Sequence, residues 1–346
     1  MKILILGGSG HIGGRLFRML DAVPGLDVWR ASRRAGNAAE RSVQVDTLDA
    51  DGLRRVLADV GCVVNCVAGN ATAISAGAKT LVAAALHTGS RVVHLSTMSV
   101  YGGAQGVVRE DTAFDPSLGW YARAKVEAEA AMADLVRQGG QAVVLRPGCV
   151  AGPGSQLWVG RIGRWLQAGR LGDIGAAGDG WSNLVHVDDV CRAVEAALRM
   201  PLAAGQLPAY NLAAPDGPRW SEYFVDLGVA IGATPVRRLS ARRVRLDAKV
   251  LGPPLKIAEK LAMKLGLPTA ALPDAMPPKT AWACAGRPTA RRSKTARTGS
   301  PARRPGAEAG RGARRALPAG QPEMLSLRAE RLRLAARIRK AGLPTT

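Results

Sequence analysis

The sequence opens with MKILILGGSGHIGG at residues 1–14, and this stretch decides the fold. Residues 3–6 form an uninterrupted apolar run, typical of a strand in a parallel sheet that is covered on both faces. A glycine loop of spacing GxxGxxG follows, and residues 15–22 are predicted to form a helix. A strand, a glycine loop and a helix in this order predict a dinucleotide site, where backbone N–H groups and the helix N-terminus face a pyrophosphate. The glycines of the spacing are Gly7, Gly10 and Gly13.

The end of the predicted second strand indicates which dinucleotide is bound. Residues 26–31 lead into Ser32-Arg33-Arg34, and Asp27 lies at the beginning of this strand, not at its end. An NAD-selective site usually has an acid at the strand's end, whereas guanidinium groups suit a 2′-phosphate. Arg33 and Arg34 therefore favour NADP, with NAD as the second option. In the alternative interpretation they are solvated loop residues of a basic chain.

Further apolar segments follow at regular intervals. Three of them read as strands: residues 42–45, residues 62–68 and residues 91–96. The first of these strands is followed by Asp46-Thr47. Alternating strands and helices predict an α/β fold with a doubly wound parallel sheet of the Rossmann type.

Tyr121 and Lys125 have the spacing YxxxK within residues 121–137, a segment rich in Ala, Glu, Lys and Arg that should be helical. Residues four apart lie on one face of a helix, so the ammonium lies beside the phenol and favours the phenolate. Tyr121 is thereby a candidate proton donor and acceptor for a carbonyl and carbinol pair. The alternative is a solvated helix face.

Together these motifs resemble the extended short-chain dehydrogenase/reductase family, often labelled NAD-dependent epimerase/dehydratase, over roughly residues 1–235. Thr97 holds the place of the Ser or Thr that, in this family, polarises the substrate oxygen. The resemblance implies that Tyr121 is the catalytic tyrosine. It implies that Lys125 also bonds the nicotinamide ribose.

The resemblance also implies cofactor contacts. Asp46 corresponds to the acid that contacts the adenine amino group, and Pro147 lies in a segment similar to the RPxxxxGPG loop beside the nicotinamide. VHVDDV at residues 185–190 and YNL at residues 210–212 resemble later motifs of the family. The expected cofactor-binding residues are Gly7, Gly10, His11, Ile12, Gly13, Arg33, Arg34, Asp46, Thr47, Ala68, Tyr121, Lys125 and Pro147.

One departure from the family concerns the substrate. Many nucleotide-sugar enzymes of the family have an arginine four residues before the histidine of VHVDD, where it grips a diphosphate, and here that position is Ser182. Loss of a charge-assisted clamp disfavours a nucleotide sugar and favours a small ketone, aldehyde or sterol-like alcohol. Arg161, Arg164 and Arg170 are candidate substitutes.

Three functions are therefore compared. The leading hypothesis is an NAD(P)-dependent oxidoreductase that transfers hydride between the nicotinamide and a small ketone, aldehyde or alcohol. The second is a nucleotide-sugar epimerase or dehydratase, and the third is a non-catalytic regulator that senses the dinucleotide. The regulator is disfavoured because the chain keeps Thr97, Tyr121 and Lys125 together.

The chain is expected to divide into a Rossmann core at residues 1–150, completed by residues 185–215, a substrate lobe at 151–275 and a basic tail at 276–346. In the lobe, residues 160–168, 218–231 and 242–265 read as helices. Its apolar residues are candidates for the pocket wall or, more often, for core packing. They include Trp158, Trp165, Trp181 and Leu184.

The tail differs from the rest of the chain in composition. Residues 276–346 contain 17 Lys and Arg against 3 Asp and Glu, whereas residues 1–275 contain 31 against 24. The tail is read as a polyanion-binding arm, a disordered extension or, the favoured option, translation in a shifted reading frame of a high-GC gene. Few aromatic residues interleave with its charges, so nucleic acid is not an expected partner.

Composition sets the remaining bounds. No apolar stretch approaches the ~18 residues that span a bilayer, and five cysteines without close-spaced pairs suit a reducing cytoplasm. Cys62 and Cys66 are read as small core residues. The four histidines lack metal spacing, and for His11 a structural role is as plausible as phosphate contact. The expected partner is a small-molecule substrate, with a homodimer left open.

Overall fold

The computed structural model describes residues 1–33, 40–251, 254–255, 257–258 and 261. Its centre is a parallel sheet of seven strands in the order β3-β2-β1-β4-β5-β6-β9. The order reverses between β1 and β4, as in a doubly wound Rossmann-type fold. The strands are β1 (Lys2–Leu6), β2 (Asp27–Ser32), β3 (Ser42–Gln44), β4 (Cys62–Asn65), β5 (Arg91–Leu95), β6 (Ala142–Pro147) and β9 (Ala209–Leu212).

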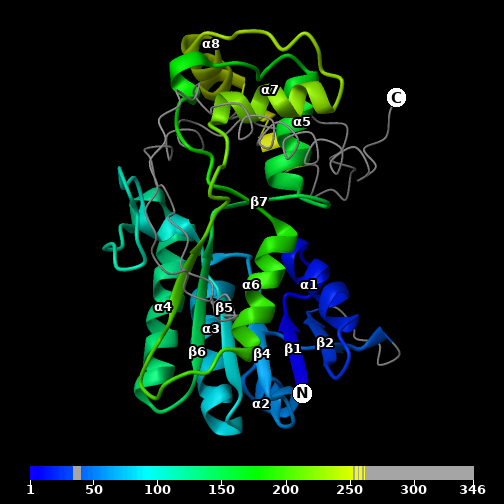
Figure 1. Cartoon of the computed structure of the whole chain (residues 1–346), viewed down its shortest axis with the longest axis vertical. Coiled ribbons are helices and arrows are strands. Elements are labelled where there is room, and N and C mark those ends of the chain that lie inside the picture. The colour runs from blue at the N-terminus through cyan, green and yellow to red at the C-terminus, as the bar shows by residue number, and fades with distance from the viewer. Residues whose placement is uncertain (34–39, 252–253, 256, 259–260, 262–346) are drawn as a thin grey trace, which may run out of the picture.

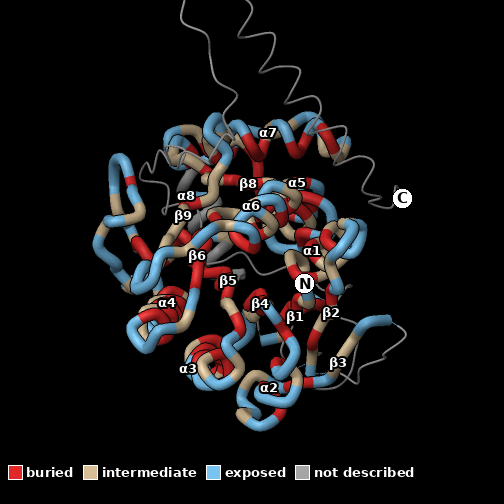
Figure 2. Tube along the Cα trace, turned by 60° about the horizontal axis from the view of Figure 1, so that its bottom comes forward, coloured by how far each residue is buried: buried red, intermediate tan, exposed pale blue. Residues whose placement is uncertain are grey.

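Helices cover both faces of this sheet (Figures 1 and 2). Ile3 and Ile5 of β1 pack towards one pair of helices, and Leu4 and Leu6 pack towards a group on the opposite face. This alternation explains why the strands read as continuous apolar runs. The first face is covered by α1 (His11–Asp21) and α6 (Val187–Arg199), and the second by α2 (Ala50–Leu57), α3 (Ala71–Thr88) and α4 (Trp120–Arg137).

A smaller lobe lies beyond the carboxyl ends of the strands, at the top of Figure 1. It has its own core, in which Trp165, Trp220 and Phe224 are buried. Its regular elements are β7 (Cys149–Ala151), β8 (Leu184–His186), α5 (Arg161–Gln167), α7 (Trp220–Ala230) and α8 (Ala241–Leu246). Short helical turns occur at Met98–Tyr101, Pro116–Leu118, Gln156–Gly160, Gly175–Gly178 and Asp247–Leu251.

One junction between the lobe and the sheet lies around Gly148. The Gly148 N–H donates to the Leu212 carbonyl at 2.9 Å, and the next N–H, of Cys149, donates to the Asn183 carbonyl at 3.0 Å. A Cβ on Gly148 would lie 2.2 Å from that Asn183 oxygen, so only glycine fits this crossing. The ends of β6 and β9 and the start of β8 therefore meet at one point.

The structure confirms the fold predicted from the sequence, with three differences. Helix α1 begins at His11, four residues before the expected start, because the loop's third glycine already belongs to its first turn. Strand β4 ends at Asn65, so Cys66 follows the strand and lines a pocket; burial raises the pKa of its thiol to about 12. The helix expected at 242–265 begins as α8, and most of its remainder lies outside the described residues.

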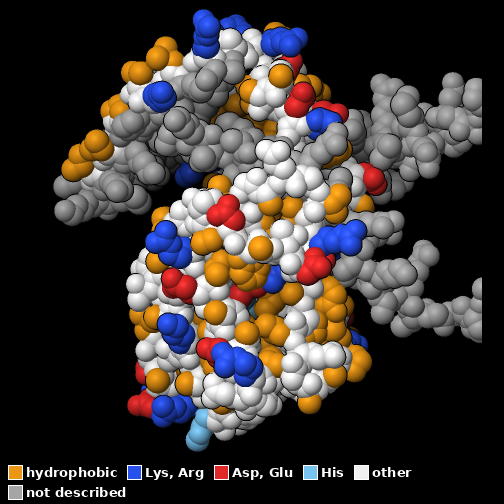
Figure 3. Space-filling view, turned by 90° about the vertical axis from the view of Figure 1, so that its left-hand side faces the viewer, with side chains coloured by type: hydrophobic (Ala, Val, Ile, Leu, Met, Phe, Trp, Pro, Cys, Tyr) orange, Lys and Arg blue, Asp and Glu red, His pale blue; other side chains and the backbone are white. Residues whose placement is uncertain are grey.

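The surface of the described part is mixed. On the face in Figure 3, hydrophobic side chains gather near the centre, with basic and acidic side chains among and around them. Large exposed apolar side chains occur at Val107, Leu118, Trp120 and Leu157. None of the helices described is both long and apolar enough to cross a membrane. The predicted tail at 276–346 lies outside the described residues.

Candidate active site

A pocket of about 1350 Å³ lies between the sheet and the lobe. Residues that follow six strands of the sheet line it, which places it at the carboxyl edge where ligands bind in open α/β folds. We call the lining residues within positions 6–48 the glycine-loop end. The lining residues within 98–118 and 156–220 form the tryptophan end.

The glycine loop leaves room for a ligand by keeping its own backbone compact. A Cβ on Gly13 would lie 2.4 Å from the Gly7 carbonyl oxygen, and a Cβ on Gly8 would lie 2.5 Å from the Arg30 Cβ. Gly7 has a φ of +75°, in the left-handed region that favours glycine. The strand, turn and helix therefore pack so closely that backbone N–H groups line the pocket, which fits a pyrophosphate.

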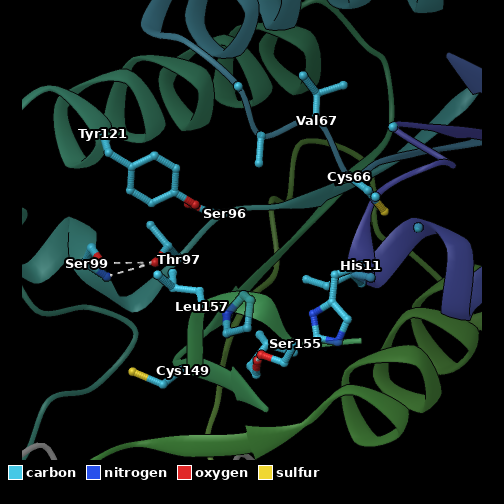
Figure 4. A pocket seen from close by; sticks show the side chains of 18 of the residues that line it. His11, Cys66, Val67, Ser96, Thr97, Ser99, Tyr121, Cys149, Ser155 and Leu157 are labelled. Atoms are coloured by element: carbon cyan, nitrogen blue, oxygen red, sulfur yellow. Dashed lines mark hydrogen bonds between the residues drawn. The ribbon is translucent and has the colours of Figure 1, made fainter. Parts of the chain in front are cut away.

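All predicted loop residues line this end, including Gly10 and Ile12. The His11 ring also faces the pocket (Figure 4), and its Nε2 lies 3.0 Å from the Pro153 carbonyl oxygen across it. Burial, followed by the neighbouring His186, lowers the pKa of His11 despite the Pro153 contact. His11 is thus neutral at pH 7 and connects the loop to the lobe, which agrees with a structural role.

The glycine-loop end is basic. Arg15, Arg18, Arg30 and Arg33 line it, together with one acid, Asp46. Arg15 holds Asp188 at 2.6 and 3.0 Å and thereby lowers the pKa of that carboxyl, although burial opposes the shift. Arg33 is exposed at the rim. Its charge is therefore available to an anionic ligand.

The other residues predicted for this end are found as follows. The Asp46 carboxylate accepts a hydrogen bond from the Leu48 N–H at 3.0 Å, and Thr47 packs against Gly77 of α3. Ala68 and Pro147 also line the pocket. Arg34 lies outside the described residues.

Tyr121 and Thr97 come together at the middle of the pocket. Figure 4 shows the Tyr121 hydroxyl directed towards Ser96 and Thr97. The Thr97 hydroxyl donates to the Ser99 Oγ at 3.2 Å and accepts from the Ser99 N–H at 3.2 Å, which fixes its orientation. Burial raises the pKa of Tyr121, opposite to the direction expected from Lys125 alone. Tyr121 is therefore protonated at neutral pH and is set up to donate.

Lys125 lies behind the pocket wall, one helical turn after Tyr121, and is only 2% exposed. Its ammonium donates to the Leu95 carbonyl at 2.7 Å and to the Val67 carbonyl at 3.2 Å. Burial lowers the pKa of Lys125 to about 8, although Cys66 and Glu129 oppose the shift. At neutral pH a buried cation therefore lies one helical turn from Tyr121 on the same helix.

The tryptophan end is neutral. Trp158, Trp181 and Trp220 line it, and none of its described residues is Lys, Arg, Asp or Glu. The wall is rigid, because the Tyr223 hydroxyl donates to the Trp158 carbonyl and the Arg219 guanidinium lies 5.0 Å from the centre of the Trp181 ring. Leu118 and Leu157 give this end an apolar rim.

Among the described residues, none of the three arginines considered for a diphosphate clamp lines the pocket. Ser182 lines the pocket, and its hydroxyl donates to the Pro218 carbonyl at 2.6 Å. Arg170 forms an ion pair with Asp247, and neither Arg161 nor Arg164 lines the pocket. Of the apolar candidates, Trp158 and Trp181 line the pocket, whereas Trp165 and Leu184 belong to the lobe core.

Sequence reasoning missed several lining residues. Arg18 and Arg30 were not selected, although Arg30 lies on β2 three residues before Arg33, so a basic cluster was visible there. Tyr101 belongs to the segment that places Thr97 but was not selected, and Leu157 and Trp220 carry no motif that marks them as lining residues. In the described part of the chain, His, Cys, Asp and Glu side chains form no group suited to a metal ion.

The sequence also matches the model of a known protein family. The model of the NAD dependent epimerase/dehydratase family matches residues 3–213. The chain belongs to this family. The match covers both the glycine loop and the YxxxK helix. The protein is therefore an NAD-dependent enzyme, as these motifs indicate. No curated protein matches the sequence.

Solved structures extend the comparison. The chain is similar to UDP-glucuronic acid 4-epimerase from Bacillus cereus in complex with UDP-glucuronic acid and NAD, with 22% identity, a TM-score of 0.60 and coverage of 69% of this chain and 86% of that one. It is also similar to a double mutant of dTDP-glucose 4,6-dehydratase from Streptomyces venezuelae with NAD bound, with 27% identity, a TM-score of 0.58 and coverage of 70% and 86%. It is similar as well to UDP-glucose 4-epimerase from Thermotoga maritima with UDP-glucose, with 21% identity, a TM-score of 0.59 and coverage of 69% of this chain and 85% of that one.

Proposed function

We propose that this family member catalyses NAD(P)-linked hydride transfer at a carbon that bears a hydroxyl or carbonyl oxygen. The observation that carries the proposal is the convergence of Tyr121 and Thr97 at the middle of the pocket, with the buried Lys125 behind them. A bound nicotinamide supplies the chemistry of hydride exchange with carbon. The protein supplies binding, orientation and proton transfer.

The roles of the residues follow from their positions. Thr97 hydrogen-bonds the substrate oxygen: the Ser99 N–H keeps the hydroxyl at the pocket wall, and the hydroxyl turns its own hydrogen from the Ser99 Oγ to the substrate carbonyl. Tyr121 donates its proton to that oxygen when a carbonyl is reduced, and it takes the proton back in the opposite direction. The Lys125 ammonium stabilises the resulting phenolate, because an opposite charge nearby favours the charged form.

For the cofactor, the compact glycine loop fits a pyrophosphate, and the clash that a Cβ at Gly13 would make shows how tightly this loop is folded. Arg33 at the rim, with Arg18 on the same end, supports NADP as the preferred dinucleotide, whereas the Arg30 guanidinium is paired with Glu40 at 2.6 Å. NAD remains the second candidate, supported by its presence in the similar solved structures.

Two substrate classes are supported by different observations. The comparisons support a nucleotide-sugar epimerase or dehydratase better than a reductase of small carbonyl compounds, because the similar structures carry such names. The neutral lining of the tryptophan end supports a small uncharged substrate, since a buried diphosphate needs a cationic partner. Hydride transfer at a carbon bearing oxygen is common to both.

One experiment tests the function and separates the classes. The protein is assayed with UDP-glucose and dTDP-glucose, and with cyclohexanone and phenanthrenequinone in the presence of NADPH or NADH. The Tyr121→Phe variant keeps the ring but lacks the proton donor, so its turnover should fall by about 100- to 10,000-fold while dinucleotide affinity persists. Turnover that is unchanged in this variant refutes the assignment of Tyr121.

A further inference from the structure

A buried network lies directly behind the candidate catalytic residues, and its centre is Arg146. This side chain, at the end of β6, donates from Nε and Nη2 to the Glu129 carboxylate, with a closest distance of 2.7 Å. Its Nη1 donates to the Tyr101 hydroxyl and to the Glu110 carbonyl, the latter at 2.8 Å. Arg146 and Glu129 are 5% and 4% exposed, so little solvent competes for these contacts.

Glu129 connects the network to the helix that carries the proton donor. Tyr121, Lys125 and Glu129 are spaced by four residues along α4, and such residues share one face of a helix. The same carboxylate also opposes the effect of burial on the pKa of Lys125. The bidentate contact with Arg146 thus fixes α4 to the end of β6 and sets the charge near Lys125.

Tyr101 connects the network to the loop that carries Thr97. Thr97 caps the short turn Met98–Tyr101, in which Tyr101 is the last residue. The Tyr101 hydroxyl accepts from Arg146 and donates to the Asn211 side-chain oxygen at 2.8 Å. The Arg146 guanidinium also lies 5.4 Å from the centre of the Tyr101 ring. Both ends of this turn are therefore held.

Glu110, in the loop after Tyr101, provides a second connection between Arg146 and β9. Glu110 accepts the Asn211 backbone N–H on its side chain at 3.0 Å, while its own carbonyl accepts from Arg146. The loop after Tyr101, strand β9 and strand β6 are thereby joined through buried polar contacts. We call Arg146, Glu129, Tyr101, Glu110 and Asn211 the Arg146 network.

We infer that the Arg146 network positions the reaction: it holds the Thr97 turn and the Tyr121 helix in one fixed relation, so that both hydroxyls reach the same substrate oxygen. The inference rests on the proposed function. Arg146 does not line the pocket, and the Tyr101 hydroxyl is bonded to Arg146 and Asn211 although Tyr101 lines the pocket, so both act as positioning residues and not as catalytic ones. Stability alone is a weak reason for such a network, because an apolar pair of similar volume is often as stable as a buried ion pair.

Substitutions separate positioning from folding. Tyr101→Phe keeps the ring but removes the hydroxyl that joins Arg146 to Asn211. We expect kcat to fall about 10- to 100-fold, as a small misplacement of reacting groups does, with KM and the Kd of NADPH changed less than about twofold. The Arg146→Met/Glu129→Leu double variant fills the same space with apolar groups. It should regain most of the stability lost by Arg146→Met alone, but not the lost kcat.

The matched control is Arg170→Gln. It breaks the half-buried ion pair with Asp247 in the lobe, away from the pocket. It should lower the melting temperature with kcat within about twofold of wild type. Each variant is assayed on the substrate that the wild-type protein turns over. The two substrates tried are phenanthrenequinone, in the presence of NADPH, and UDP-glucose.

The outcomes are distinct. A loss of kcat in Tyr101→Phe and in the double variant, with NADPH affinity kept, supports the inference. Unchanged kcat in Tyr101→Phe, or full recovery of kcat in the double variant, overturns it and leaves the proposed function intact. Absence of turnover by the wild-type protein on the whole panel of four substrates refutes the proposed function, and the inference with it.

Discussion

The two ends of the pocket differ in charge, and this difference indicates what each binds. The glycine-loop end has four arginines among its lining residues, whereas the described residues of the tryptophan end include no charged side chain. Arginine is placed where bidentate binding of phosphate is needed, and aromatic walls suit the apolar faces of ring-shaped groups. Recognition by charge and recognition by shape are thus separated, with Tyr121 and Thr97 between them. The following experiments test that separation.

The largest expected effect is at the glycine loop. In Gly13→Ala the new Cβ would lie 2.4 Å from the Gly7 carbonyl, so strand and helix must move apart. We expect the Kd of NADPH, measured by fluorescence titration, to rise by about 100-fold, equal to about 2.7 kcal/mol. Gly14→Ala is the control, because its Cβ meets the Gly8 carbonyl at an ordinary 3.4 Å. If Gly13→Ala binds NADPH as tightly as the wild-type protein, the loop does not contact the dinucleotide; Gly14 also lines the pocket, so its variant controls only for the packing clash.

A second test concerns the buried cation between the ends. Lys125 has a pKa of about 8 in the folded protein, below its ordinary value of 10.5. The cost of burying the ammonium is therefore present below pH 8 and disappears as the pH rises towards 10.5. Lys125→Met should abolish turnover yet raise the unfolding free energy by about 1–3 kcal/mol at pH 7, after allowance for the lost contacts with two carbonyls.

Urea denaturation at pH 7 and pH 10 measures this effect. The advantage of Lys125→Met should shrink at the higher pH. Lys79→Met, at an exposed position of α3, should stay within about 0.5 kcal/mol of wild type at both pH values. If Lys125→Met is less stable at pH 7, the contacts of the ammonium outweigh the cost of its burial.

The third test concerns the choice of dinucleotide at the charged end. Arg33→Glu should raise the Kd of NADPH by about 10- to 100-fold and that of NADH much less, since only NADPH has a 2′-phosphate. Arg55→Glu makes the same change of charge on the exposed surface of α2, outside the pocket. A similar loss for both cofactors in Arg33→Glu would indicate that this guanidinium does not contact the 2′-phosphate.

The smallest effect comes from salt. An increase in NaCl from about 0.05 M to about 0.5 M screens exposed charges, so the Kd of NADPH should rise by about three- to tenfold. The KM of a substrate that occupies the neutral tryptophan end should stay constant under the same conditions. A KM that rises in parallel would instead indicate an anionic substrate and favour a nucleotide sugar.

Much of the fold could be predicted because its signals are local. Apolar runs such as residues 3–6 mark buried strands, and the spacings of the glycines and of YxxxK place the loop and the candidate proton donor. The predicted neighbours Tyr121 and Thr97 do meet in the pocket. The sequence predicts that Lys125 favours the phenolate of Tyr121, whereas burial raises the pKa of Tyr121 in the structure. This prediction was wrong because burial depends on packing that the helix spacing does not reveal.

The rest depends on contacts between distant segments. The partners of Arg146 lie at positions 101, 110 and 129, and no short motif joins them. The tryptophan wall likewise combines Trp158, Trp181 and Trp220, which only the lobe fold brings together. The fate of Ser182 was equally hidden, because its hydroxyl binds Pro218, 36 residues away.

The junction at Gly148 has a consequence for how specificity evolves. Two backbone hydrogen bonds join the chain segments that meet there. The Gly148 N–H donates to the Leu212 carbonyl of the sheet, and the Cys149 N–H donates to the Asn183 carbonyl of the lobe. Backbone contacts do not depend on which side chains the lobe carries. A lobe of different lining can therefore be placed on an unchanged sheet and glycine loop, which changes the part of the substrate wall that residues 156–220 supply and leaves the dinucleotide end as it is.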